Sequence, residues 1–275
     1  MTKISFEYFP PRNEAQLERF RATHKALCTL NPEYFSVTFG AGGSTRDETA
    51  MAVDEIGLSQ SVAPHISCRG GSEESIRRLL NHYQEKGVKK LVVLRGDPTS
   101  GSVGGDTFRF ANDLVRFIKR EYADQFAMSV ACYPEVHPES SSASDDLRFF
   151  KAKVDAGADD AITQYFFNAD AYFRFVDAAA AKGVSIPIVP GIMPITNYAQ
   201  LKRFSDVCGA QIPRWLDARL QDFGDDKKSL GEFGLDVVAD MCQRLIDGGA
   251  PALHFYTLNR TASTVNLVSR LGIST

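Results

Sequence analysis

Long hydrophobic runs are missing from this sequence of 275 residues. A membrane-spanning helix needs about 20 consecutive apolar residues, and no stretch comes near that length. The first residues, MTKISFEYFPPRNE, place a glutamate and two prolines where a signal peptide has its uninterrupted apolar segment. We therefore expect a soluble, cytoplasmic protein that has no membrane partner.

A strong excess of charge of one sign is missing as well. The chain has 31 lysine and arginine residues against 34 aspartate and glutamate residues, which gives a formal net charge of -3. No basic block is long enough to follow a phosphate backbone, so nucleic acid is not an expected partner. The composition, 44% hydrophobic and 24% charged, excludes a disordered or fibrous chain.

Cysteine and histidine are few and show no ligand spacing. The five cysteines are odd in number, widely spaced and form no CxxC pair, so we predict reduced thiols. The five histidines form neither HxxxH nor HExxH, which leaves a zinc site without support. No serine or cysteine stands beside an evident base for nucleophilic catalysis. The chemistry is therefore expected from carboxylates, single histidines or a bound organic cofactor.

Eight short runs rich in branched and aromatic residues alternate with amphipathic helical stretches. Most of their starts are separated by the length of a strand, a crossover helix and a return, which predicts a parallel sheet. The interval before the last run is about twice as long as the others, and it predicts extra helices over part of the mouth of the fold. The runs begin at Ile4, Glu33, Val62, Lys90, Ala127, Asp160, Ile186 and Ala252.

This alternation predicts one (β/α)8 TIM barrel, a single domain over residues 1–275. Such a barrel takes about 250 residues and carries its site on the loops after the carboxyl ends of its strands. An open dinucleotide-binding sheet is the alternative, and it should have GxGxxG after its first strand, where this sequence has FPPR. The nearest match, GAGGST at residues 40–45, is equally compatible with a plain turn.

Glu7 is the polar residue of the first predicted strand. Strand alternation places it on the inward face together with Ser5 and Phe9, while Phe6 and Tyr8 point the other way. Burial inside a barrel would raise the pKa of this carboxyl group and suit it to act as a general acid near neutral pH. Pairing with a buried arginine is the alternative.

Other predicted strands also end in polar residues, which is typical of the catalytic face of a barrel. Arg95, Gly96 and Asp97 follow the fourth strand, where they either bind a ligand or shape a turn through a salt bridge. These strand ends together indicate a mouth suited to a flat aromatic ligand. The further candidates are His65, Tyr133, Glu135, His137, Glu139, Gln164, His254, Tyr256, Asn259 and Arg260.

Nine ordered segments resemble methylenetetrahydrofolate reductase of the bacterial, catalytic-domain-only type. The resemblance runs from about residue 4 to residue 273 and implies a (β/α)8 barrel that binds FAD. It further implies ping-pong reduction of 5,10-methylenetetrahydrofolate to 5-methyltetrahydrofolate by NADH or NADPH, for methionine synthesis, in a homo-oligomer. Related barrels with a protein electron donor, or a binding subunit without activity, are the alternatives. The segments are SFEYFPPR, FSVTFGAGGSTRD, APHISC, LRGDP, YPEVHPE, KVDAGAD, AITQYFF, PGIMPITN and HFYTLNR.

The resemblance implies roles for individual positions. Glu7 matches the general acid that protonates N10 of the folate, and Asp97 matches a carboxylate beside the flavin and the pterin. FAD contacts are implied for Thr38, Phe39, Ala41, His65, Arg95, Gly96, Asp97, Ala111, Tyr133, His137, Asp146 and Lys153. Substrate contacts are implied for Glu7, Thr38, Asp97, Gln164, Phe204 and Arg260. No metal is implied.

Overall fold

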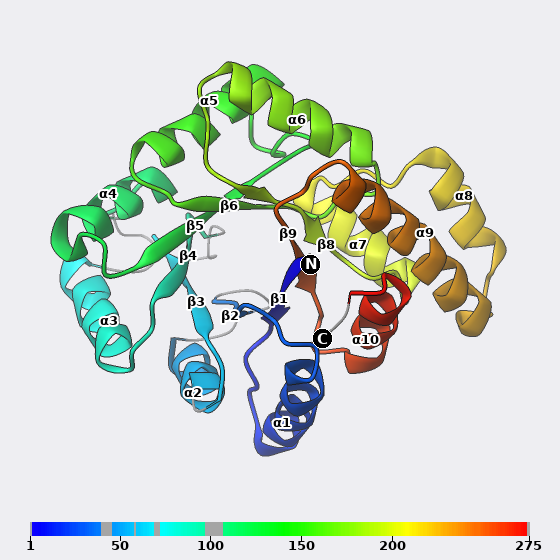
Figure 1. The fold of residues 1–275 in the computed structure, drawn as a ribbon, viewed down its shortest axis with the longest axis horizontal. Helices are drawn as coiled ribbons and strands as arrows, with labels where there is room; N and C mark the ends of the chain where they lie inside the picture. Colours follow the sequence, from blue (N-terminus) through cyan, green and yellow to red (C-terminus); the bar gives the residue numbers. More distant parts are fainter. Residues whose placement is uncertain (1, 40–45, 58, 69–71, 97–106, 274–275) are drawn as a thin grey trace.

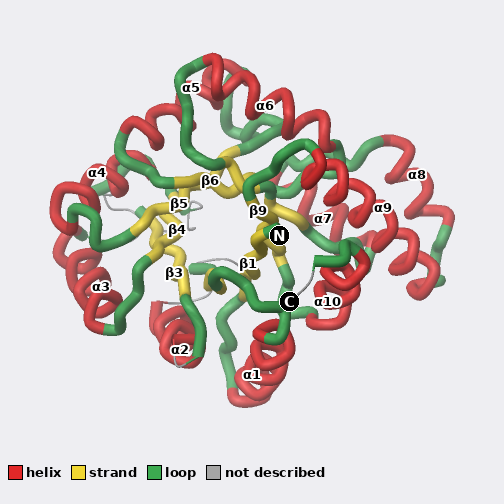
Figure 2. Tube along the Cα trace, viewed as in Figure 1, coloured by secondary structure: helices red, strands yellow, loops and turns green. Residues whose placement is uncertain are grey.

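A computed structural model of the chain describes residues 2–39, 46–57, 59–68, 72–96 and 107–273. Its strands form a ring that is surrounded by helices (Figure 1, Figure 2). The strands are β1 (Lys3–Tyr8), β2 (Phe35–Val37), β3 (Val62–Ser67), β4 (Lys90–Leu94), β5 (Ala127–Cys132), β6 (Asp160–Thr163), β7 (Ile188–Val189), β8 (Gly191–Ile192) and β9 (Ala252–Tyr256). The helices are α1 (Glu14–Cys28), α2 (Arg46–Gly57), α3 (Glu73–Glu85), α4 (Ala111–Tyr122), α5 (Ala143–Asp155), α6 (Ala169–Ala181), α7 (Tyr198–Cys208), α8 (Arg214–Asp222), α9 (Lys227–Asp247) and α10 (Thr261–Arg270).

The ring closes through a strand that is split in two. The strand order is β7-β6-β5-β4-β3-β2-β1-β9-β8, with β7 paired to β6 and β8 paired to β9, in parallel. Only Pro190 separates β7 from β8. Proline has no N–H for a ladder bond, so it interrupts the single seventh strand that the sequence predicts. The predicted (β/α)8 barrel is confirmed, with its seventh strand in two pieces.

Capping residues set the helix starts. The side chains of Asn13, Ser72 and Ser142 each accept a hydrogen bond from a backbone N–H in the first turn of α1, α3 and α5. The buried residues of α4, such as Leu114 and Ile118, recur at helical spacing. One apolar stripe of the helix therefore faces the sheet and the remainder faces water.

The core between the ring and the helices is aromatic around β1. Phe6 lies 5.8 Å, between ring centroids, from both Phe35 of β2 and Phe255 of β9. Tyr8 packs edge-on against Phe20 of α1 at 5.0 Å. Phe6 and Tyr8 therefore point outward, which turns the intervening Glu7 into the barrel.

The amino-terminal end of the barrel carries a separate polar cluster. Lys90, at the start of β4, pairs with Asp160, at the start of β6, and only 17% and 19% of these side chains are exposed. Ser129 also donates a hydrogen bond to Asp160, and the ammonium group of Lys90 lies 5.1 Å from the ring centroid of Tyr34. Since catalytic residues of such barrels lie at the opposite face, this cluster serves stability.

Three helices follow β8, as the long interval in the sequence predicts. Helix α9 contacts α6 and α10 and so holds the crossover position before β9. Helix α8 lies at the periphery of the molecule (Figure 1). The start of α7 does reach the mouth, because Arg260, after β9, donates hydrogen bonds to Thr196 and Gln200.

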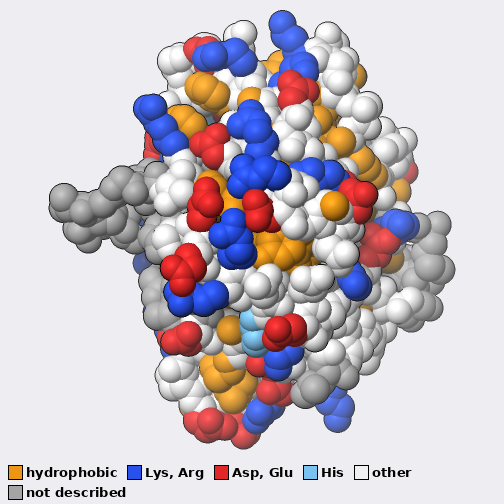
Figure 3. Space-filling view, turned by 90° about the vertical axis from the view of Figure 1, so that its left-hand side faces the viewer, with side chains coloured by type: hydrophobic (Ala, Val, Ile, Leu, Met, Phe, Trp, Pro, Cys, Tyr) orange, Lys and Arg blue, Asp and Glu red, His pale blue; other side chains and the backbone are white. Residues whose placement is uncertain are grey.

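The surface formed around α3 and α4 carries charges of both signs. Lysine and arginine side chains lie among aspartate and glutamate side chains on this face (Figure 3). Arg77 pairs with Glu121 at 3.0 Å, and Arg116 pairs with Asp113 at 3.3 Å. Over the described ranges, no helix combines the length and the apolar character needed to cross a membrane.

Candidate active site

Glu7 lies inside the barrel between two imidazoles. Its Oε2 is 3.2 Å from Nε2 of His65, on β3, and 3.7 Å from Nε2 of His254, on β9. Both histidines are buried, and 16% of the Glu7 side chain is exposed. The inward position predicted for Glu7 agrees with the structure, and the neighbours found for it are histidines in place of the alternative arginine.

The ionisation of Glu7 differs from the sequence-based expectation. Burial alone would raise the pKa of this carboxyl group, but its contacts with His254 and His65 outweigh burial and lower the pKa to about 2. The expected upward shift is therefore wrong, because the carboxyl group shares the barrel interior with two imidazoles. Glu7 is ionised at neutral pH in the chain as it stands.

His254 is held in one orientation by two serines. Its Nδ1 lies 2.7 Å from Oγ of Ser5, and its Nε2 lies 3.4 Å from Oγ of Ser36. All three residues are buried. The ring therefore presents Nε2 toward Glu7 while the Ser5 hydroxyl holds its other nitrogen. The sequence analysis named His254 as a strand-end residue and gave it no role. Strand alternation places it on the inward face, between the outward Leu253 and Phe255, and this pattern could have indicated a role beside Glu7.

Two buried polar atoms at the mouth are unsatisfied. Oγ1 of Thr38 and Nε2 of His65 have no hydrogen-bond partner among the described residues. His65 is close to Glu7 but is not aligned with it for a well-formed hydrogen bond. Buried polar groups are normally paired, so both atoms are suited to meet polar atoms of a ligand. The resemblance implies flavin contacts for both residues, and the unsatisfied atoms fit such a ligand.

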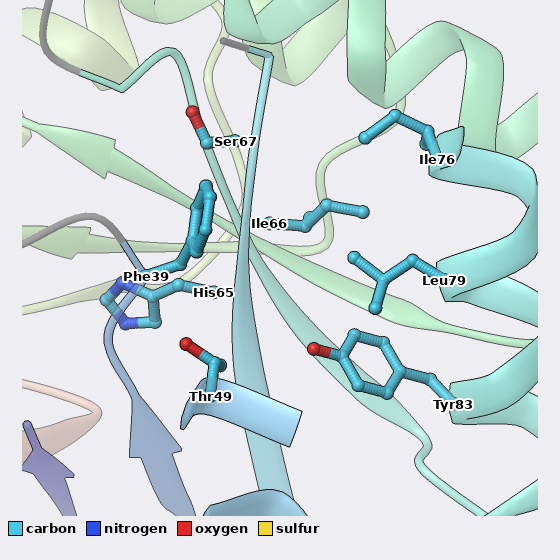
Figure 4. Close-up of a pocket in the computed structure, with 8 residues that line it drawn as sticks. All are labelled: Phe39, Thr49, His65, Ile66, Ser67, Ile76, Leu79 and Tyr83. Carbon is cyan, nitrogen blue, oxygen red and sulfur yellow. The ribbon is translucent and has the colours of Figure 1, made fainter. Parts of the chain in front are cut away.

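The end of β3 separates the barrel interior from the helices outside. His65 lies beside Phe39 on one side of β3, and Ile66 points to the other side, toward Leu79 and Tyr83 of α3 (Figure 4). A cavity of about 10 Å³ lies among these residues. It has room for about one water molecule and is not a ligand site.

The loop after β5 assembles a second group of predicted residues. The rings of Tyr133 and His137 meet edge to face at an interplanar angle of 73°, with centroids 4.5 Å apart. The backbone N–H of His137 donates to Oδ2 of Asp146 at 3.1 Å, and Nδ1 of His137 accepts from the backbone N–H of Glu139 at 3.0 Å. Arg95, after β4, pairs with Glu139 at 2.7 Å. Four of the predicted flavin contacts are thus brought together.

Lys153, on α5, lies behind this loop. Its Nζ donates to the backbone oxygen of Ala131, and burial lowers the pKa of its ammonium group. Val136 nearby has a φ of 71°, a conformation that a β-branched residue rarely adopts. Backbone strain of this kind is typical of functional sites.

The remaining predicted residues lie on other elements. Ala111 begins α4, and Phe204 lies partly buried on α7. The side-chain oxygen of Gln164 accepts from the N–H of Tyr165 at 3.0 Å. Gly96 follows Arg95 with a φ of 81°, a conformation that glycine adopts readily. Ala41 and Asp97 lie outside the described residues.

The loop after β9 is tied to the end of β1. The side chain of Asn259 accepts from the N–H of Phe9 at 3.0 Å and donates to the Phe9 oxygen at 2.8 Å. Leu258 and Asn259 both have left-handed backbone conformations, with φ of 50° and 55°. Sequence reasoning missed this link, since it depends on residues 250 positions apart.

Comparison with known proteins identifies the family. The family model described as methylenetetrahydrofolate reductase matches residues 1–272. The chain belongs to the methylenetetrahydrofolate reductase family. It is thus a member of an oxidoreductase family of folate metabolism with the (β/α)8 fold.

Curated relatives agree over nearly the whole chain. The 5,10-methylenetetrahydrofolate reductase of Escherichia coli (strain K12) is 39% identical over 274 residues, which cover 98% of this chain and 90% of that protein. The enzyme of Buchnera aphidicola subsp. Acyrthosiphon pisum is 37% identical over 273 residues, 98% of this chain and 92% of that protein. "Methylenetetrahydrofolate reductase (NADH) 1" of Zea mays is 35% identical over 289 residues, covering 99% of this chain and 48% of that protein.

A solved structure shares the fold at lower identity. An uncharacterized protein from Clostridium thermocellum, described as binding two copies of 5-methyl-5,6,7,8-tetrahydrofolic acid, superposes with a TM-score of 0.72 at 14% identity. The match covers 99% of this chain and 95% of that one. Within the described ranges, the histidine, cysteine and acidic side chains form no cluster that could hold a metal ion.

Proposed function

We propose that this chain reduces 5,10-methylenetetrahydrofolate to 5-methyltetrahydrofolate with NADH or NADPH and bound FAD, and so supplies methyl groups for methionine synthesis. The observation that carries the proposal is the inward Glu7, held between His65 and His254 at the mouth of a barrel of this family. We extend the proposal to residues 1–275 as one catalytic domain of a homo-oligomer.

The residues at the mouth fit FAD. The unsatisfied atoms of Thr38 and His65 would meet polar atoms of the flavin, and Phe39 lies beside His65 (Figure 4). FAD, when bound, supplies the hydride carrier between the nicotinamide nucleotide and the folate. The residues proposed to hold it are Thr38, Phe39, Ala41, His65, Arg95, Gly96, Asp97, Ala111, Tyr133, His137, Asp146 and Lys153.

Glu7 is proposed to protonate N10 of the folate. The bond between N10 and the methylene carbon then breaks, and the resulting 5-iminium cation can accept hydride. Because the pKa of Glu7 is about 2 in the chain alone, the carboxylate must share a proton with a neighbour in order to act as an acid. His254 is placed for this task, since its Nε2 faces Glu7 while Ser5 holds its Nδ1.

Other side chains are proposed to position the folate. Asp97 would place a negative charge near the cation, where it stabilises the charge that develops. Thr38 and Gln164 would contact either reactant in turn, because both must reach the same mouth. Phe204 on α7 would stack on the folate or the nucleotide, and Arg260 lies at the rim between β9 and α7.

Purified protein tests the proposal directly. The visible spectrum should show the bands of oxidised flavin, and NADH or NADPH should support folate reduction with no other protein present. Turnover that requires an added flavoprotein or ferredoxin would favour the alternative electron donor. A flavin-free protein after reconstitution with FAD would contradict the assignment.

A further inference from the structure

Tyr165 lies between two residues that the proposed function assigns to substrate binding. It directly follows Gln164 at the end of β6, and its backbone N–H donates to the side-chain oxygen of Gln164 at 3.0 Å. Its hydroxyl lies 3.1 Å from Oγ of Ser205, which directly follows Phe204 on α7. One buried side chain thus joins the end of β6, where Gln164 lies, to the helix that carries Phe204.

The hydroxyl of Tyr165 is buried and has two partners on α7. Only 5% of Tyr165 and 3% of Ser205 are exposed. Sγ of Cys208 also donates to the Tyr165 hydroxyl, at 3.3 Å. Ser205 and Cys208 are three residues apart, so they lie on the same face of the helix. Because a buried hydroxyl without partners is costly, these bonds favour one position of α7 against the barrel.

Phe204 lies on the side of α7 that borders the mouth. Gln200, four residues before it, accepts a hydrogen bond from Arg260 at 2.8 Å, and residues four apart share a helix face. Arg260 follows β9 at the rim of the barrel. The face with Ser205 therefore attaches the helix, while the adjacent face with Phe204 lies toward the site.

Both ends of α7 are held by bonds that do not involve Tyr165. The first turn is bound by Arg260. Beyond the last turn, the N–H of Gln211 donates to Oε2 of Glu135, after β5, at 2.8 Å. Loss of the Tyr165 hydroxyl should therefore shift the second half of the helix without detaching it.

We infer that Tyr165 is a positioning residue, whose hydroxyl holds α7 where Phe204 can stack on a bound reactant; the inference rests on the proposed function. Tyr165 acts through Ser205 and Cys208 and takes no part in the chemistry. The apparent Kd of a ligand rises as the arrangement that binds it becomes less populated. Removing the hydroxyl should therefore weaken binding and leave the chemical steps unchanged.

The test compares Tyr165→Phe with Tyr172→Phe. Both variants delete a buried tyrosine hydroxyl, but that of Tyr172 donates to the Ile188 oxygen at 2.8 Å and so ties α6 to β7. We expect Tyr165→Phe to raise the KM for 5,10-methylenetetrahydrofolate about five-fold, as the loss of one hydrogen bond would, with kcat within about two-fold of wild type. Tyr172→Phe should lower the melting temperature similarly and keep the wild-type KM.

Phe204→Ala separates a positioning role from a merely structural one. In that background the ring that Tyr165 positions is gone, so Tyr165→Phe should raise KM no further, and the two changes should not be additive. A wild-type KM in Tyr165→Phe, or an effect on KM that is the same with and without the Phe204 ring, would overturn the inference. Equal effects of Tyr165→Phe and Tyr172→Phe on KM would overturn it too, since general destabilisation would then explain both.

Failure of the proposed function looks different, because the wild type would then reduce no folate. In that case, hydrogen exchange of the α7 amides and calorimetric titration with 5-methyltetrahydrofolate still decide the inference. Faster exchange in the second half of α7 together with weaker binding, in Tyr165→Phe and not in Tyr172→Phe, supports it. Exchange or affinity that Tyr165→Phe leaves unchanged contradicts it. Melting curves of all variants check that each is folded.

Discussion

Glu7 of β1 and His65 of β3 approach each other to 3.2 Å inside the barrel, and His254 of β9 completes the group at 3.7 Å. Three strands far apart in the sequence thus place one carboxyl group between two imidazoles. The arrangement keeps Glu7 ionised in the chain alone, with its pKa at about 2. The proposed protonation of the substrate by Glu7 therefore depends on its histidine neighbours as well.

Under the proposed function, Glu7→Gln is expected to separate the two half-reactions. The amide cannot donate a proton as an acid does, so folate reduction should fall by at least about a hundred-fold. Reduction of the flavin by NADH needs no such acid and should keep its rate. Stopped-flow absorbance under anaerobic conditions follows each half-reaction by itself. Loss of both would show that Glu7 is needed for the architecture of the mouth.

The low pKa of Glu7 makes stability depend on pH. The folded-state pKa, about 2, lies below the ordinary value of 4.5, so the contribution is fully present above pH 4.5 and is lost as the pH falls toward 2. The loss should be about 1.4 kcal/mol for each pH unit in this window. Urea unfolding at several pH values, in wild type and Glu7→Gln, measures it. A constant difference between the two proteins from pH 6 to pH 3 would contradict the low pKa.

Asp160→Ala should affect stability without affecting catalysis. It leaves the largely buried ammonium group of Lys90 unpaired, which costs about 3 to 5 kcal/mol in comparable buried pairs. The pair lies at the amino-terminal end of the barrel, so kcat at a permissive temperature should stay near the wild-type value. Replacing Lys90 by Met in the same chain should recover part of the loss. Chemical unfolding and turnover, measured on the same samples, test both statements.

Gly191→Ala and Gly231→Ala are a matched pair of variants that compares a crowded position with an open one. A Cβ on Gly191 would lie 2.2 Å from the backbone oxygen of Thr163 and 2.6 Å from the ring of Tyr256, whose hydroxyl donates to that oxygen at 2.7 Å. Gly191→Ala should therefore cost about 1 to 3 kcal/mol or more, because the barrel wall must shift. Gly231, inside α9, has open space around it, and Gly231→Ala should stabilise by about 0.5 to 1 kcal/mol. Thermal unfolding of both variants and of the wild type measures the two effects. An unchanged stability of Gly191→Ala would mean that the barrel wall can shift without cost.

The sequence was sufficient to predict the barrel. Alternation of strand and helix specifies parallel crossovers, and period-two alternation around Glu7 specifies which side chains enter the ring. Both are local properties, so they can be recognised without coordinates. The division at Pro190 could also have been anticipated, since a proline cannot donate to a ladder.

The electrostatics of the site could not be predicted in this way. The pKa of Glu7 depends on His65 and His254, and the register of β1 with β9 decides that His254 faces inward beside Ser5. The expectation that the pKa of Glu7 is raised took only burial into account and left out these neighbours. The link between Asn259 and Phe9 likewise joins the two ends of the chain, and no local pattern reports it.

Because only Pro190 stands between β7 and β8, the first and last strands of the sheet are consecutive pieces of one segment. An open sheet has two edges whose unpaired N–H and C=O groups can recruit strands from other chains. Here a single residue separates the two edge strands along the chain, and that residue has no N–H to offer. The split strand therefore closes the barrel against strand addition and edge-to-edge aggregation.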